Sequence, residues 1–264
     1  MGILNVTPDS FSDGGRWAST DAAIARGVEL ASQGAEIIDV GGESTRPGAL
    51  PVSGEAEQSR VIPVIRELAG AGLVVSVDTL HADTARAAIE AGAAIINDVS
   101  GGLADPAMAS VAADTGSPYI AMHWRGHAQE MDRRAEYADV VQDVRRELEA
   151  RVEALQAAGV TPGQLILDPG LGFSKHGTDN WALLAHLDVL QGLGFPVMVG
   201  ASRKRFLAEL LPAGAPVTDR DLPTSVISAL AARAGAWAVR VHDVESTRTA
   251  LAVLGRLDSD RMDA

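Results

Sequence analysis

The sequence contains no cysteine. Disulfide bonds, thiol nucleophiles and cysteine-ligated metal sites are therefore excluded, and the composition suits a cytoplasmic protein. Aromatic residues make up only 4% of the chain, so the core must be built from Ala, Val, Leu and Ile. Basic residues are also scarce: 22 Lys and Arg stand against 35 Asp and Glu, a formal net charge of −13. Such a chain lacks the basic face that nucleic-acid binding needs, but it can hold a small anion in a locally basic pocket.

Long apolar runs are absent too. No stretch of about 18 apolar residues occurs, so the sequence predicts no transmembrane helix and no membrane partner. Short apolar runs recur instead, and each is typical of a buried strand in a parallel sheet. The eight runs are GILNV, EIIDVGG, LVVSVDT, AIINDVS, YIAMH, LILDPG, PVMVGAS and AVRVHD.

Segments with a helical period separate these runs. They are predicted over residues 21–33, 55–68, 83–91, 106–114, 137–158, 180–190, 223–234 and 244–257. Pro63 should kink the second of them or mark its true start. We therefore predict one α/β domain over residues 1–264, a single (β/α)8 TIM barrel whose tail frays from about residue 258. A doubly wound sheet is the alternative, but its Gly-x-Gly-x-x-Gly turn is absent after the first run.

Polar side chains end three of the predicted strands, at Asp78, Asn97 and Asp168. The carboxyl ends of barrel strands meet at one mouth, where active sites lie. Two carboxylates and a carboxamide match a planar heterocycle with a guanidine-like edge, such as guanine or a pterin. Alternatively, Asp78 and Asp168 only cap the turns that follow them. Because all three stand at one mouth, the ligand interpretation is favoured.

Basic residues gather on the last two predicted strands. Arg240 and His242 are two positions apart and share one face of the strand. Barrels often bind phosphate at the loops after strands seven and eight, so we predict an anion site there, with surface ion pairs as the alternative. The residues expected around it are Asn5, Ser202, Arg203, Lys204, Arg240 and His242. Two turn-rich loops, TPDSFSDGG and GGESTRPG, would lie at the same mouth as lids or plain connections.

Seven motifs in order resemble the signatures of dihydropteroate synthases. They are MGILNVTPDSFSDGG, DVGGESTRPG, VSVDT, IINDVSGG, LILDPGLGF, GASRKRF and VRVHDV, and the resemblance runs from residue 2 to about 257. RVIPVI, MHWR and GAWAVRVHDV are most similar to actinobacterial members. The resemblance implies a homodimeric transferase of folate synthesis that joins 6-hydroxymethyl-7,8-dihydropterin pyrophosphate to 4-aminobenzoate, with Mg²⁺ as cofactor and sulfonamides as competing ligands.

The resemblance also assigns roles to residues of this sequence. It implies that the pterin is held by Asp78, Asn97, Met122, Asp168, Phe173 and Lys204. Pyrophosphate would contact Asn5, Arg46, Arg240 and His242, with Asn5 also the metal ligand. Aminobenzoate would contact Phe11, Ser12, Thr45, Arg46, Pro47, Ser202 and Arg203. The catalytic residues would be Asp13, Lys204, Arg240 and His242, acting in a dissociative mechanism without a protein nucleophile.

Two other functions remain as alternatives. A methyltetrahydrofolate methyltransferase barrel serving a corrinoid protein would share the pterin-binding Asp, Asn and Asp residues. Its reaction would not require the paired loops or the anion site. A catalytically silent paralogue is the other alternative, although every matching site residue is present. The segment RGHAQEMDRRAEY, residues 125–137, matches nothing in the family pattern, and its role stays open.

Overall fold

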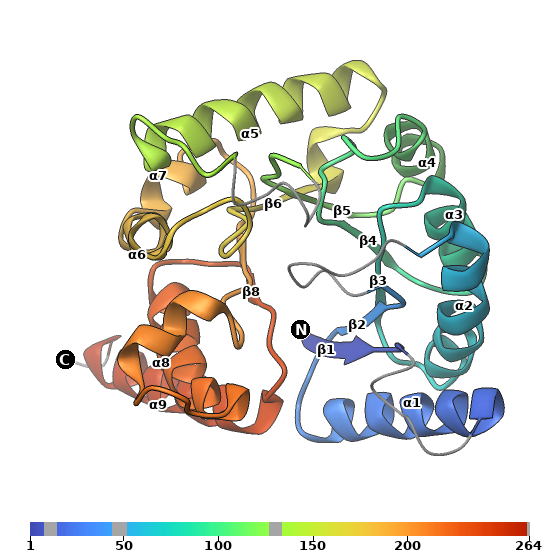
Figure 1. Cartoon of the computed structure of the whole chain (residues 1–264), viewed down its shortest axis with the longest axis horizontal. Helices are drawn as coiled ribbons and strands as arrows, with labels where there is room; N and C mark the ends of the chain where they lie inside the picture. The colour runs from blue at the N-terminus through green and yellow to red at the C-terminus, as the bar shows by residue number, and fades with distance from the viewer. Residues whose placement is uncertain (8–14, 44–51, 127–133, 263–264) are drawn as a thin grey trace.

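The computed structural model describes residues 1–7, 15–43, 52–126 and 134–262. Within these residues, strands and helices alternate along the chain (Figure 1). The strands are β1 Gly2–Asn5, β2 Ile38–Gly41, β3 Val75–Asp78, β4 Ile95–Asp98, β5 Tyr119–Met122, β6 Leu165–Asp168, β7 Met198–Val199 and β8 Ala238–Val239. The helices are α1 Gly15–Ser32, α2 Gly54–Gly70, α3 Ala82–Glu90, α4 Met108–Thr115, α5 Val140–Ala157, α6 Gly177–Ala185, α7 Leu187–Gln191, α8 Asp221–Arg233 and α9 Val244–Met262.

The strands close into a barrel. Strands β1 to β6 pair in parallel in chain order, and β7 pairs with β8. Bridges between Leu167 and Val197 and between Gly2 and Val241 join the two sheets at both seams. At the second seam the Ile3 amide donates to the Val241 carbonyl at 2.9 Å. The helices lie around the outside of this ring, as Figure 1 shows, which confirms the predicted (β/α)8 barrel.

The barrel interior is layered. Ile95, Ile120, Ile166 and Met198 form an apolar cluster separate from the main core between strands and helices. Side chains two positions apart on a strand share a face, so the next inward residues on β4, β5 and β6 are Asn97, Met122 and Asp168. The apolar cluster is therefore the floor beneath a polar layer at the carboxyl ends of the strands.

Some helix boundaries differ from the sequence predictions. Ser53 caps α2, its hydroxyl accepting from the Ala56 amide, so the helix begins at Gly54 and Pro63 lies inside it rather than at its start. The predicted helix 180–190 is two helices, because the backbone leaves the helical region at His186 (φ −127°, ψ 41°). Helix α9 continues to Met262, beyond the expected fraying point. Among the described residues, no helix combines the length and the apolar character that crossing a membrane requires.

Candidate active site

Arg240, which directly follows β8, ties the polar layer together. Its Nε donates to Asp39 Oδ2 at 2.6 Å, and its Nη2 donates to Asp78 Oδ2 at 2.5 Å. The Asn97 amide nitrogen donates to the same Asp39 oxygen at 3.1 Å. Residues from β2, β3, β4 and the end of β8 therefore form one buried network, and it contains two of the three predicted strand-end residues.

Asp168 ends β6 and uses its two oxygens differently. Oδ1 accepts from the Gly170 amide at 2.7 Å, so this oxygen caps the following turn, as the alternative interpretation predicted. Oδ2 is turned toward Gly200, 3.5 Å from where a β-carbon would stand there. A side chain at Gly200 would fill the space between Asp168 and Lys204, whose Nζ would lie 3.8 Å from that β-carbon. Gly200 therefore leaves room for a ligand beside the Asp168 carboxylate.

Lys204 lies beside Asp168 and above an aromatic ring. Its Nζ is 4.7 Å from the centroid of the Phe173 ring and donates to the Leu171 carbonyl oxygen. Met122 stands in register with Asp168 on the neighbouring strand and is 3% exposed. The predicted pterin residues on β5, on β6 and in the loops after β6 and β7 are thus grouped at one side of the mouth.

Burial controls the charge of these groups. It raises the pKa of the Asp78 carboxyl to about 7, against the opposing charge of Arg240. Burial also raises the pKa of Asp168, and the charge of Lys204 opposes this shift. Burial lowers the pKa of Lys204 to about 8, although Asp168 favours its charged form. For Arg240, burial is outweighed by Asp39 and Asp78, which raise the pKa of the guanidinium. A ligand that donates N–H groups to these carboxylates would relieve the cost of burying them.

Ser202 and His242, two of the predicted anion-site residues, form a pair. The Ser202 hydroxyl lies 2.9 Å from His242 Nδ1 and accepts from the His242 amide at 3.0 Å. The Arg203 guanidinium makes a bidentate ion pair with Asp221 of α8, with both hydrogen bonds at 2.7 Å. This contact is of the kind that the alternative interpretation of ion pairs describes. A contact between Arg203 and aminobenzoate would require this pair to open.

The chain is similar to known proteins over most of its length. Residues 1–242 match the family model described as pterin binding enzyme. The dihydropteroate synthase of Mycobacterium leprae is 54% identical over 97% of this chain and 92% of its own length. The chain belongs to the dihydropteroate synthase family.

Solved structures of this family share the fold. The dihydropteroate synthase of Xanthomonas albilineans with 4-aminobenzoic acid has a TM-score of 0.91 and 45% identity, covering 98% of this chain and 92% of that one. The Yersinia pestis dihydropteroate synthase in a sulfonamide drug complex has a TM-score of 0.91 and 41% identity, covering 98% and 94%. The family resemblance inferred from the sequence is thereby confirmed.

The described residues account for only part of the predicted site. Asn5 ends β1 in register with Gly41, which is in turn in register with Asp78. It therefore stands on the same rim as the polar network. Six predicted residues of the two loops, Phe11, Ser12, Asp13, Thr45, Arg46 and Pro47, lie outside the described residues, and their roles stay predictions.

Sequence reasoning missed Asp39, which is fully buried and contacts both Arg240 and Asn97. A signal for it exists in the run EIIDVGG, where Asp39 stands between the apolar residues Ile38 and Val40. A buried carboxylate is costly unless it is paired, so such a residue predicts a partner. The sequence does not say that the partner stands 201 positions away.

Proposed function

We propose that this chain condenses 6-hydroxymethyl-7,8-dihydropterin pyrophosphate with 4-aminobenzoate, giving 7,8-dihydropteroate and pyrophosphate in folate biosynthesis. The observation that carries the proposal is the buried layer of Asp78, Asn97 and Asp168, in which Arg240 binds Asp78 directly and is joined to Asn97 through Asp39. Its acceptors suit the guanidine-like edge of a pterin. Membership of the family supports the choice of reaction.

On the pterin side, each polar residue offers a defined atom. The Asn97 amide nitrogen faces Asp39, which leaves the Asn97 carbonyl oxygen as the acceptor for a ligand N–H. Asp168 Oδ2, beside Gly200, is the corresponding acceptor on β6. Asp78 completes the set, and Met122 and Phe173 supply the apolar surface against the faces of the ring.

On the anion side, Arg240 and His242 hold the pyrophosphate. As the bond between the pterin methylene carbon and the pyrophosphate oxygen breaks, negative charge grows on the oxygen, and cations fixed at that place stabilise it. Asp168 and the predicted Asp13 stabilise the positive charge left on the methylene carbon. The amine of 4-aminobenzoate is neutral at pH 7, so it attacks that carbon without a general base and then loses its proton to water.

Mg²⁺ is the metal ion of this proposal, with Asn5 as its protein ligand. The described residues contain no group of three His, Cys, Asp or Glu side chains that could hold a metal. A carboxamide oxygen at the rim fits Mg²⁺, which commonly takes one or two protein oxygens and completes its shell with substrate phosphates and water. When bound there, the ion would neutralise charge on the pyrophosphate.

Release of pyrophosphate from the pterin substrate tests the proposal, measured with and without 4-aminobenzoate and Mg²⁺. We expect release to require both. A folded protein that releases none would refute the activity and favour the silent paralogue. Methyl transfer from methyltetrahydrofolate to a corrinoid would instead favour the methyltransferase barrel.

Two further expectations belong to the same proposal. Sulfonamides should compete with 4-aminobenzoate, which is supported by the drug complex of the Yersinia pestis relative. The enzyme should also be a homodimer. Leu222, Val226 and Leu230 are exposed at four-residue intervals on α8, and exposed Val253 and Leu257 lie on α9, which packs beside α8 (Figure 1). A second copy of the chain would cover this apolar surface.

A further inference from the structure

Lys175 is a buried lysine with no carboxylate among its hydrogen-bond partners. It is 6% exposed, and its ammonium group has three acceptors within reach. They are His123 Nδ1 at 2.9 Å, the Gly170 carbonyl at 3.0 Å and the Phe173 carbonyl at 3.0 Å. Burying a lysine is costly, and burial lowers the pKa of Lys175 to about 7, although the charges of Asp168 and Glu147 oppose that shift. Two of these acceptors belong to the loop after β6, so the contacts fix the geometry of that loop.

The loop that Lys175 holds shapes the pterin side of the site. The Gly170 amide orients the Asp168 carboxylate, and the Phe173 ring lies beneath Lys204. Gly170, Gly172 and Ser174 all have positive φ values, of 66°, 76° and 46°. Three left-handed residues so close together cannot continue a helix or a strand, so the loop depends on contacts from outside it.

His123 carries the contact from Lys175 to helix α5. It is 3% exposed, and its Nε2 lies 3.0 Å from Glu147 Oε2. Because Nδ1 accepts from Lys175, Nε2 carries the proton and donates to the carboxylate. Burial and the charge of Lys175 lower the pKa of His123 to about 4, so the ring is neutral at pH 7 and keeps Nδ1 as an acceptor.

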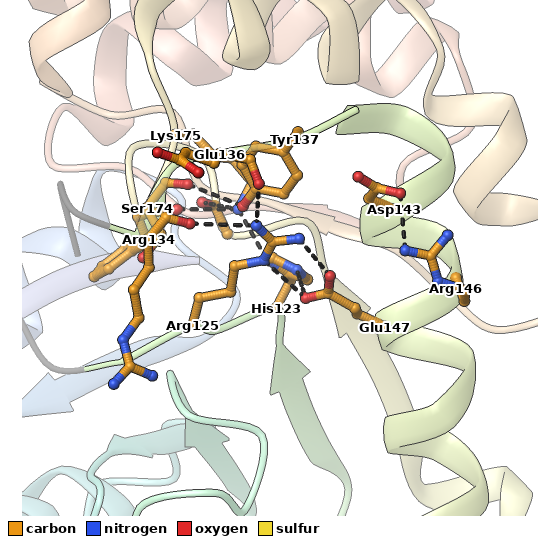
Figure 2. Close-up of polar contacts among 12 residues, drawn as sticks. His123, Arg125, Arg134, Glu136, Tyr137, Asp143, Arg146, Glu147, Ser174 and Lys175 are labelled. Carbon is orange, nitrogen blue, oxygen red and sulfur yellow. Dashed lines mark hydrogen bonds and ion pairs between the residues drawn. The ribbon is translucent and has the colours of Figure 1, made fainter. Parts of the chain in front are cut away.

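Arg125 and Tyr137 connect Glu147 back to the loop after β6, as Figure 2 shows. Arg125 donates to both oxygens of Glu147, at 2.5 and 3.0 Å, and its guanidinium lies 3.8 Å from the centroid of the Tyr137 ring. The Tyr137 hydroxyl then donates to the Ser174 carbonyl at 2.9 Å. The contacts thus form a closed circuit from Lys175 through His123, Glu147, Arg125 and Tyr137 to Ser174, and we call it the Lys175 circuit.

We propose that Lys175, held in this circuit, is a positioning residue that fixes Asp168 and Phe173 for the pterin. The inference rests on the proposed function, because it takes the ligand beside Asp168 to be a pterin. It also gives Arg125 and Tyr137, the first and last residues of the segment 125–137 that matches no family pattern, a defined part in the site. Neither Lys175 nor Tyr137 touches substrate in this scheme, and both act through the loop between them.

The test compares three variants by calorimetry with 6-hydroxymethylpterin, which lacks the pyrophosphate, and by steady-state kinetics. Lys175→Met removes all three donors while keeping the length of the side chain, and we expect at least about a tenfold loss of pterin affinity. Tyr137→Phe removes one hydroxyl without changing any charge, so we expect a smaller loss of about twofold to fivefold. In both variants the KM for 4-aminobenzoate should stay near the wild-type value.

Arg146→Ala is the matched control. Arg146 pairs with Asp143 at 2.8 Å, close to Glu147 on α5 but outside the circuit (Figure 2), and we expect no change in pterin affinity. Wild-type affinity in folded Lys175→Met, or in Tyr137→Phe, would overturn the proposal, as would an equal rise in both KM values. Failure of the proposed function is distinct, because the wild-type protein would then bind no pterin or release no pyrophosphate.

Discussion

Arg240 is a predicted anion-binding residue that contacts two buried carboxylates. The sequence places it with the anion-binding residues, and on that view Arg240→Ala should spare the binding of a pterin that lacks pyrophosphate. In the structure its Nε and Nη2 donate to Asp39 and Asp78, and Asp78 is one of the residues that we propose to hold the pterin. On the proposed function we therefore expect Arg240→Ala to affect pterin binding as well.

We predict that Arg240→Ala weakens binding of 6-hydroxymethylpterin at least about tenfold and lowers the melting temperature. Removing one partner of a buried ion pair costs about 3–5 kcal/mol, because the remaining charge is left unpaired. Calorimetry and thermal unfolding measure the two effects. Arg86→Ala, which removes an exposed ion pair with Asp114, is the control and should change neither. Unchanged pterin affinity in Arg240→Ala would show that Arg240 serves the anion alone.

His123 predicts a pH dependence of stability. Its pKa in the folded protein is about 4, lowered by burial and then by Lys175 from an ordinary 6.5. Between these values the unfolded chain binds the proton more readily, so acidification favours unfolding and stability falls as the pH drops. From pH 7 to about pH 5.5 the loss due to His123 is about 1 kcal/mol.

Urea unfolding of the wild type and of His123→Gln at pH 7 and at about pH 5.5 measures the contribution of His123 to the free energy of unfolding. The variant lacks the titrating ring, so its stability should change by about 1 kcal/mol less over the same interval. In this range the raised pKa of Asp78 contributes with opposite sign, and the pKa of Lys175, which burial lowers to about 7, contributes with the same sign as His123. Both groups are present in the two proteins, so the comparison isolates the ring of His123. Equal pH dependence in the two proteins would contradict a buried, neutral His123.

At the scale of elements, the loop after β6 depends on Gly170. Its φ is 66°, and a β-carbon there would lie 2.3 Å from the His123 carbonyl oxygen. We predict that Gly170→Ala destabilises the protein by about 2–4 kcal/mol and misplaces Asp168, since the backbone must both strain and shift. Chemical denaturation and pterin calorimetry detect the two consequences.

Gly214→Ala is the matched control for this loop. Gly214 also has a positive φ, of 81°, but a β-carbon there meets nothing within 4 Å. We expect Gly214→Ala to lower the free energy of unfolding by about 1 kcal/mol, the cost of placing an alanine at positive φ, with no loss of pterin affinity. If Gly170→Ala and Gly214→Ala lose the same stability and both keep pterin affinity, the close approach of Gly170 to the His123 carbonyl has no role in the site.

Elements were predictable from the sequence to different degrees. Every strand follows from a short apolar run, because strands covered on both faces carry apolar residues almost continuously. The break between α6 and α7 leaves no such pattern, since it depends on the backbone at His186 alone. Asp78 and Asp168 were found because they end strands, whereas Lys175 was not, because its acceptor His123 is 52 positions away and only the folded barrel joins them.

At the scale of the whole molecule, the exposed stripe on α8 predicts assembly. Leu230→Glu places a charge in the middle of the surface that we assign to a second copy, and we expect the dimer to become a monomer. Light scattering coupled to size exclusion measures the mass, and circular dichroism checks that the variant folds. Leu103→Glu, at an exposed leucine after β4, is the control and should stay dimeric. A wild-type monomer would contradict the homodimer itself.

The sharing of one guanidinium by two carboxylates also has a thermodynamic consequence. Arg240 has five N–H groups, and those committed to Asp39 and Asp78 are not available to an anion. A ligand that donates hydrogen bonds to Asp78 frees N–H groups of Arg240 for an anion. An anion that accepts hydrogen bonds from Arg240 in turn leaves Asp39 and Asp78 with fewer donors. Linkage then requires pterin and pyrophosphate to alter each other's affinity by the same factor.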